Sequence, residues 1–322
     1  MEFTELKNEV VAAGLYKKNP WKYVVHFTLI MLGVAASCYL LMITDNLFVQ
    51  ILNGVFFGSV LVQAGLLGHD FSHQQVFSSA KYNSVCASVI WGLFGGLREG
   101  GCDEKHNAHH KHVNHEGLDP DLNIPFIFAA KQSPSKHKFI MKYVAPYQHF
   151  VFFMVLPFAY STMMLWSFKT VFSSFSLKNI LEATLMIVHF VLLIGVPLLF
   201  LPVLSVVGFC LAMFFTIGLY MGVAFAPNHK GQEVLHADDE HDWTHQITLT
   251  RNIRYSPFVF HFFGGLDLQI EHHLFPDMPR YNYRKAQVFV KSYCIKHDLT
   301  YHETTWFGSM KEIYLALKVH AA

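Results

Sequence analysis

Four long apolar stretches constrain the fold of this chain more than any other feature of its sequence. A helix needs about 20 mainly apolar residues to cross the hydrocarbon core of a bilayer. The stretches that meet this requirement are paired by short turns into two hairpins, 23–43 with 47–68 and 181–201 with 203–226. We therefore expect an all-α integral membrane protein with four transmembrane helices.

The composition of the chain agrees with this expectation. Of its 322 residues, 52% are hydrophobic and only 15% are charged, whereas soluble domains carry about 25% charged residues. The net charge of +1 and the lack of a dense basic stripe argue against nucleic-acid binding. The five cysteines include no CxxC pair, which argues against a disulfide scaffold or a thiolate zinc site. Residues 1–22 end in no small-residue cleavage site, so we expect no signal peptide.

Two further apolar segments are assigned to the membrane interface. Segment 150–166 is interrupted by a proline, and segment 85–97 is too short to span. With four spans, all 24 Lys and Arg residues fall on one side, because neither hairpin turn contains one. The positive-inside pattern makes that side cytoplasmic. We expect a single domain over 1–322, with a cytoplasmic cap formed by 69–148 and 227–322.

Three histidine clusters lie beside these membrane segments: HDFSH at 69–73, HNAHHKH at 106–112 and QIEHH at 269–273. Positions i and i+4 share one face of a helix, so each of the first two clusters can hold an ion through such a pair. Neutral imidazole is a good ligand for Fe, Zn, Cu and Ni. The histidines are too many for one ion, and we expect two ions to share them. They are His69, His73, His106, His109, His110, His272 and His273.

The motifs HDxxH, HxxHH and QxxHH, in this order and separated by paired spans, resemble the three histidine boxes of the membrane fatty acid desaturase family. The stretches NHKGQEV, DWTHQITLTRNI and LQIEHHLFPDMPRYNY resemble its front-end branch, which places double bonds between an existing one and the carboxyl end of the chain. GLDPDL at 117–122 also fits. Gln269 stands where other branches of the family have a histidine, as is typical of the front-end group.

The resemblance implies further site residues. Members of the family use an additional histidine on the segment that leaves the last span, and His229 occupies that place here. Metal-bound imidazoles usually donate their other N–H to a carboxylate or carbonyl. Neighbouring side chains are therefore candidates to orient the ligands or contact substrate, and they are Asp70, Asp119, Asp121, Asn228, Gln269 and Glu271.

The resemblance also implies a reaction, the O2-dependent removal of two hydrogens from adjacent CH2 groups of an acyl chain to give a cis double bond. These C–H bonds carry no acidic proton, so a metal-bound oxidant is required rather than an acid–base residue. The implied cofactors are two iron ions, which zinc can replace in a recombinant preparation, with O2 as co-substrate. The substrate is an acyl-CoA or an acyl-lipid, which we expect to enter a narrow hydrophobic tunnel.

Two electrons must come from a donor. The chain has no HPGG haem motif and only 22 residues before its first expected span. We therefore expect a separate donor, either a ferredoxin or cytochrome b5 with its reductase. The lack of a fused cytochrome favours a bacterial inner membrane over the endoplasmic reticulum.

Other functions are compatible with the same residues. A hydroxylase can use similar boxes and stop after one oxygen transfer, and a delta-9-type desaturase remains an alternative because some bacterial enzymes that act near mid-chain share the Gln. A membrane zinc hydrolase of lipids would use the imidazoles to activate water. A metal transporter would place polar or metal-binding residues inside its spans, which offer little of that kind apart from His26 and His189.

Overall fold

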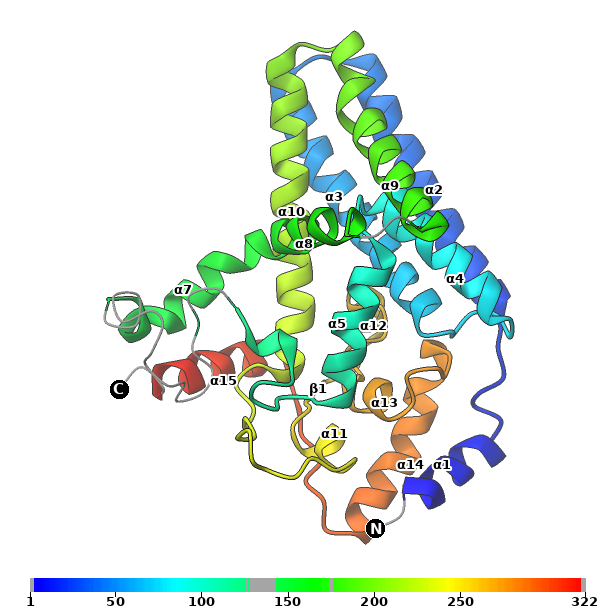
Figure 1. The fold of residues 1–322 in the computed structure, drawn as a ribbon, viewed down its shortest axis with the longest axis vertical. Coiled ribbons are helices and arrows are strands. Elements are labelled where there is room, and N and C mark those ends of the chain that lie inside the picture. Colours follow the sequence, from blue (N-terminus) through cyan, green and yellow to red (C-terminus); the bar gives the residue numbers. More distant parts are fainter. Residues whose placement is uncertain (1–2, 125–126, 128–142, 174–175, 320–322) are drawn as a thin grey trace. The chain divides into compact units, whose positions relative to one another are not determined.

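The computed structural model describes residues 3–124, 127, 143–173 and 176–319, and their regular secondary structure is almost entirely helical (Figure 1). Their strands form one short parallel pair, β1 (Asn252–Ile253) with β2 (Glu303–Thr304). The expected all-α class is therefore confirmed. The α-helices are α1 (Phe3–Ala12), α2 (Pro20–Ile43), α3 (Leu47–Ser72), α4 (Ala80–Val89), α5 (Glu99–Lys111), α7 (Gln148–Val155), α8 (Ala159–Val171), α9 (Leu177–Phe190), α10 (Val203–His229), α11 (His245–Thr248), α12 (Pro257–Phe263), α13 (Gln269–Leu274), α14 (Tyr283–Lys296) and α15 (Trp306–Val319).

Five helical segments are long and apolar enough to cross a membrane, by length and composition. The sequence predicted four, because it assigned 150–166 to the interface. That stretch belongs to the longer helical segment Ala145–Val171, which a 3-10 turn at Leu156–Phe158 divides into α7 and α8. The helix extends beyond the apolar residues because backbone hydrogen bonds do not depend on side-chain polarity. The other segments are Pro20–Ile43, Leu47–Ser72, Leu177–Leu199 and Val203–His229.

The chain divides into two compact units, each built from separated parts of the sequence. We call one the span unit, which comprises Lys18–Asp103 and Leu156–Gly222. We call the other the histidine unit, which comprises Met1–Lys17, Glu104–Val155 and Val223–Ala322.

Capping residues and glycines shape the span unit. The side chain of Asn46 accepts a hydrogen bond from the Val49 N–H and begins α3. A Cβ added at Gly54 would lie 2.3 Å from the Phe209 carbonyl oxygen, and one at Gly218 would lie 1.8 Å from the Pro157 carbonyl oxygen. The backbones of the packed segments therefore approach too closely for any side chain at these positions. In Figure 1, α8 runs across the direction of the upright α9 and α10.

The first box lies on a helix rather than in a loop. The predicted span ended at residue 68, whereas α3 continues through Ser72, and the His73 N–H donates to the His69 carbonyl oxygen at 3.0 Å. The segment predicted at 85–97 includes the end of α4 and a π-helical turn at Ile90–Phe94.

A hydrophobic core in the histidine unit holds the third box in place. Leu6 and Val10 of α1 and Val290 of α14 are fully buried in it, together with Ile270 and Phe275 in and beside α13. The short helix α13 thus packs against α14, which also packs against α1. All six residues of α13, Gln269–Leu274, are buried.

Candidate metal centre

Helix α5 brings the histidines of the second box together. His106 and His110 are one turn apart, with ring centroids separated by 4.5 Å and Nε2 atoms separated by 3.1 Å. The ring of His109 is 6.2 Å from that of His106. The helical spacing that the sequence predicts therefore places two imidazoles of this box edge to face.

The third box meets the second box inside the histidine unit. The ring of His273 stacks on that of His110 at 4.2 Å, and the ring of His272 lies 4.7 Å from that of His110. Both His272 and His273 are buried. Residues that are about 160 positions apart in sequence therefore form one imidazole cluster.

His229, the last residue of α10, completes a triangle with His109 and His273. The ring centroids are 4.7 Å apart for His109 and His229, 4.6 Å for His229 and His273, and 5.1 Å for His109 and His273. One ligand atom from each residue lies within 4.8 Å of the others, and all three side chains are buried. This spacing fits three imidazoles around one ion.

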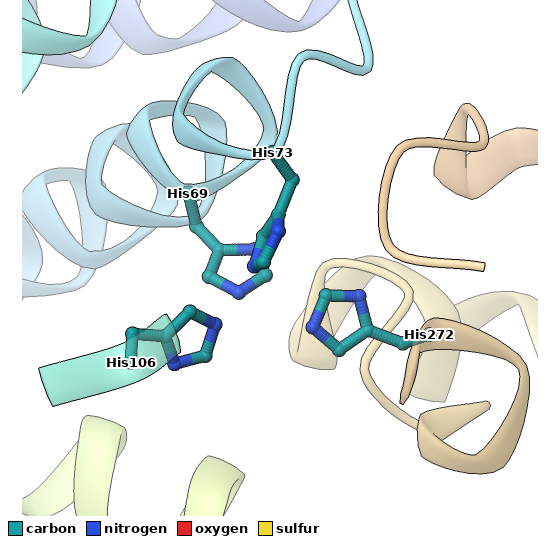
Figure 2. Close-up of side chains that lie close together, drawn as sticks. All are labelled: His69, His73, His106 and His272. Atoms are coloured by element: carbon teal, nitrogen blue, oxygen red, sulfur yellow. The ribbon is translucent and has the colours of Figure 1, made fainter. Parts of the chain in front are cut away.

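His106, His110 and His272 form the remaining group of this unit. Figure 2 shows His106 extending from α5 and His272 from α13, and their ring centroids are 6.2 Å apart. Burial lowers the pKa of His106 to about 4. Its imidazole is therefore neutral at neutral pH, which is the form that binds a metal.

The first box forms a pair within the span unit. His69 and His73 lie side by side at the end of α3 (Figure 2), with ring centroids 4.6 Å apart. Their separation of one helical turn is the one that the sequence predicts. Asp70, beside them, is buried, and its carbonyl oxygen accepts a hydrogen bond from the Gln75 N–H at 2.9 Å.

Comparisons with known proteins identify the family of the chain. The profile of the fatty acid desaturase family matches residues 46–305, which include all three boxes. The chain belongs to the fatty acid desaturase family. Family membership confirms the predicted resemblance and the predicted enzyme class, an oxidoreductase.

Individual desaturases match along almost the whole chain. An acyl-lipid (9-3)-desaturase of Physcomitrium patens is 28% identical over 98% of this chain and 62% of its own length. A Delta(8)-fatty-acid desaturase of Borago officinalis is 28% identical over 96% of this chain and 72% of its own. A Delta(5) fatty acid desaturase of Caenorhabditis elegans is 30% identical over 95% and 70% respectively. These relatives support the front-end branch, and the chain spans less than two thirds of the first of them.

The carboxylate of Asp119 contacts a box histidine directly. Both of its oxygens accept from His109 Nδ1 at 3.0 Å, and Asp121 Oδ2 lies 3.8 Å from the same nitrogen. Although burial lowers the pKa of His109, the Asp121 charge and the Asp119 hydrogen bond raise it overall. Burial raises the pKa of Asp119, and the His109 hydrogen bond lowers it overall. The pair fixes which ring nitrogen of His109 faces the other histidines.

Gln269 and Asn228 lie beside His229. The Asn228 amide donates to Gln269 Oε1 at 3.1 Å, and Gln269 Nε2 lies 3.2 Å from His229 Nε2. Gln269 thus contacts an imidazole directly, where other branches of the family have a histidine.

Glu271 faces away from the imidazoles. Its oxygens accept from Asn252 Nδ2 at 2.7 Å and from the Tyr301 hydroxyl at 2.8 Å. Burial raises the pKa of Glu271 to about 7. These two hydrogen bonds connect α13 to β1 and to the segment before β2.

Two residues that the sequence reasoning missed contact the third box. The hydroxyl of Tyr283 lies 3.0 Å from His272 Nδ1. The side chain of Gln246 accepts from His273 Nδ1 at 2.7 Å and donates to the His110 carbonyl oxygen at 2.7 Å. Both lie in the tail stretches that resemble the family, which was the only signal available, since neither is adjacent to a box in sequence.

Imidazole nitrogens dominate the donor set of this cluster, and buried neutral imidazoles suit iron, zinc or copper. The residues present therefore fit the metal ions that the family implies. An ion held here would supply a Lewis acid and redox centre next to an apolar chain.

Proposed function

We propose that this chain is an O2-dependent fatty acyl desaturase of the front-end type, which introduces a cis double bond into an acyl-CoA or acyl-lipid. The observation that carries the proposal is the convergence of histidines from two boxes and the end of α10 in one buried cluster. The boxes occur in the order typical of the family to which the chain belongs.

Two iron ions are proposed as the cofactor, held by eight histidines. His109, His229 and His273 are grouped around one position in the histidine unit, which supports a shared ion. When bound, the metals supply the oxidising power that unactivated C–H bonds require. The eight proposed ligands are His69, His73, His106, His109, His110, His229, His272 and His273.

The protein residues hold and orient the ligands. Asp119 keeps a proton on His109 Nδ1, and Gln246 does the same for His273. Each imidazole is thereby left with its other nitrogen for coordination. All six residues of α13 are buried, which limits the access of water to His272 and His273.

For the membrane arrangement, we propose four crossings, with α8 along the interface. The 3-10 turn at Leu156–Phe158 and the direction of α8 across α9 and α10 support this arrangement (Figure 1). All 24 Lys and Arg residues then face one side, which is the cytoplasm. The 69–148 and 227–322 parts form the cap there. The proposed location is a bacterial inner membrane, although the relatives named above are eukaryotic.

A separate protein is proposed as the electron donor, either a ferredoxin or cytochrome b5 with its reductase. To test the function, cells co-express such a donor with either the intact chain or the His110→Ala variant. Both sets of cells are fed 18-carbon acids and compared. Mass spectrometry locates double bonds in the extracted acyl chains. A new double bond towards the carboxyl end, formed only with the intact chain, is expected.

Other products would overturn specific parts of this proposal. A double bond near mid-chain would replace the front-end assignment with a delta-9-type reaction. A hydroxy acid would replace desaturation with hydroxylation. No oxidised product, with the donor active and the chain well expressed, would contradict the function and direct the next assay to zinc-dependent lipid hydrolysis.

A further inference from the structure

The end of α10 needs hydrogen-bond donors from outside the helix. The last four carbonyl groups of a helix have no partner within it. In α10 these carbonyls precede and include His229, and Pro227 lies among them. The orientation of the His229 ring therefore depends on whatever side chains hold this helix end.

Arg251 donates to two of these carbonyls and to the carbonyl of Lys230, just beyond the helix. Its side chain is fully buried in the histidine unit. Nε donates to the Pro227 carbonyl oxygen at 2.6 Å, and Nη2 donates to the Lys230 carbonyl oxygen at 2.6 Å. The Arg251 backbone N–H donates to the Asn228 carbonyl oxygen at 2.9 Å. One residue thus holds carbonyl groups on both sides of His229.

Helix α15 holds the guanidinium in place. Glu312 Oε2 accepts from Arg251 Nη1 at 2.5 Å, and the Ser309 hydroxyl donates to the Pro227 carbonyl oxygen at 2.8 Å. Trp306 Nε1 donates to the Val223 carbonyl oxygen at 3.1 Å. The helix is therefore bonded to α10 both directly and through Arg251.

A positively charged group at a helix C-terminus also interacts favourably with the helix dipole. Arg251 suits this place because its planar fork donates in several fixed directions, whereas a lysine offers one compact charge. A buried guanidinium is costly unless it is paired, and Glu312 provides the pair. Arg251, Glu312 and Ser309 thus form one hydrogen-bonded group at the end of α10, which we call the clamp.

We infer that Arg251, held by Glu312 and Ser309 of α15, is a positioning residue. It orients the His229 ring towards His109 and His273. The inference rests on the proposed function, because it assigns His229 to a metal ion. Ser309 and Glu312 lie beyond residues 46–305, the part that matches the family profile. The α15 part of the clamp therefore lies outside the residues that match the family profile, whereas Arg251 lies within them.

The test measures bound iron per chain, and the affinity of each ion, in the purified full-length protein after reconstitution. The variants are Arg251→Lys, Glu312→Gln and Ser309→Ala, with His229→Ala as the reference. Glu5→Gln is the matched control, because it removes an ion pair with Lys296 elsewhere in the histidine unit. Thermal unfolding of each metal-free protein is measured in parallel.

Arg251→Lys is expected to weaken one of the two ions by about 10–100-fold, the range found when a group that orients a metal ligand is removed. Glu312→Gln and Ser309→Ala should weaken the same ion by a smaller factor, and Glu5→Gln should leave both ions unchanged. In the double variant with His229→Ala, Arg251→Lys should cause no further loss, since its effect acts through that ligand.

Specific results would overturn the inference. Arg251→Lys protein that binds two ions with unchanged affinity would overturn it. A further loss of ion affinity when Arg251→Lys is added to His229→Ala would also overturn it. If Arg251→Lys does not fold, Glu312→Gln and Ser309→Ala decide the question by the same criteria. An intact chain that binds no ion would overturn the proposed function itself, so the two failures are distinguishable.

Discussion

The histidine unit and the span unit position their residues by different means. In the histidine unit, side chains hold the imidazoles, as Asp119 does for His109 and Gln246 does for His273. In the span unit, glycines such as Gly54 and Gly218 let backbones approach closely. One unit is therefore organised by directed hydrogen bonds, and the other mainly by close packing.

This difference follows from the surroundings of each unit. Apolar helices gain little from burying apolar side chains against one another in lipid, so small residues and van der Waals contact hold them together. A cluster of polar ligands instead requires each ring to be turned in one direction, which hydrogen bonds specify. Substitutions should therefore damage assembly in the span unit and metal affinity in the histidine unit.

The largest effect is expected from Gly218→Ala, which would break the packing of the span unit. The added Cβ would lie 1.8 Å from the Pro157 carbonyl oxygen, so backbone must move. Overpacking typically costs about 1–3 kcal/mol, and we expect the upper end of that range. The measurement is the yield and melting temperature of the protein in detergent.

Gly65→Ala is the control for this prediction, because its Cβ would make an ordinary contact with Trp91 at 3.7 Å. Equal behaviour of the two alanine variants would show that close backbone approach is not what holds the span unit together.

The second effect concerns the histidine unit. Asp119→Asn keeps the shape of the side chain but weakens the acceptor of the His109 N–H, and we expect a loss of roughly 10–100-fold in metal affinity. Iron titration of the metal-free protein measures this loss. Asp121→Asn is the control, since Asp121 is 3.8 Å from His109 and its side chain is 54% exposed. A melting temperature that falls while metal affinity stays constant would contradict an orienting role.

A smaller loss is expected from Tyr283→Phe. The change removes the hydroxyl that lies 3.0 Å from His272 Nδ1 and keeps the buried ring. A neutral hydrogen bond contributes about 1 kcal/mol, so metal affinity should fall several-fold. The same iron titration tests this, and a loss as large as that of Asp119→Asn would contradict the ranking of charged above neutral partners.

The smallest effect is a gain of stability from Asp267→Asn. Asp267 is fully buried, and among the described residues neither of its carboxylate oxygens has a hydrogen-bond partner. Burial raises its pKa from the ordinary 3.8 to about 7. The folded protein therefore binds the proton more tightly than the unfolded chain, and stability falls as pH rises from about 3.8 through about 7.

The asparagine variant lacks this pH-dependent loss, so its advantage should grow as pH rises from about 3.8 through about 7. Melting curves at pH 5 and pH 8 measure it. An advantage that is the same at both pH values would show that the carboxylate charge is not the cause.

Much of the fold and part of the candidate site follow from local sequence. Runs of apolar residues predict the long helices, and the i, i+4 spacing predicts that His69 pairs with His73 and His106 with His110. The helix ends were less predictable. The polar residues after position 68 extend α3 through Ser72, because a helix can continue by backbone hydrogen bonds after its apolar face has ended.

The sequence by itself determined the family, the presence of long apolar helices and the residue types that can bind metal, because helical periodicity and motif order are local properties. Only the tertiary structure placed His229 beside His109 and His273. It also brought Gln246 to His110, Tyr283 to His272 and Arg251 to the end of α10. These contacts join positions up to 136 residues apart. Their geometry depends on how separate helices pack, since a hydrogen bond needs its donor and acceptor within about 3 Å and correctly directed.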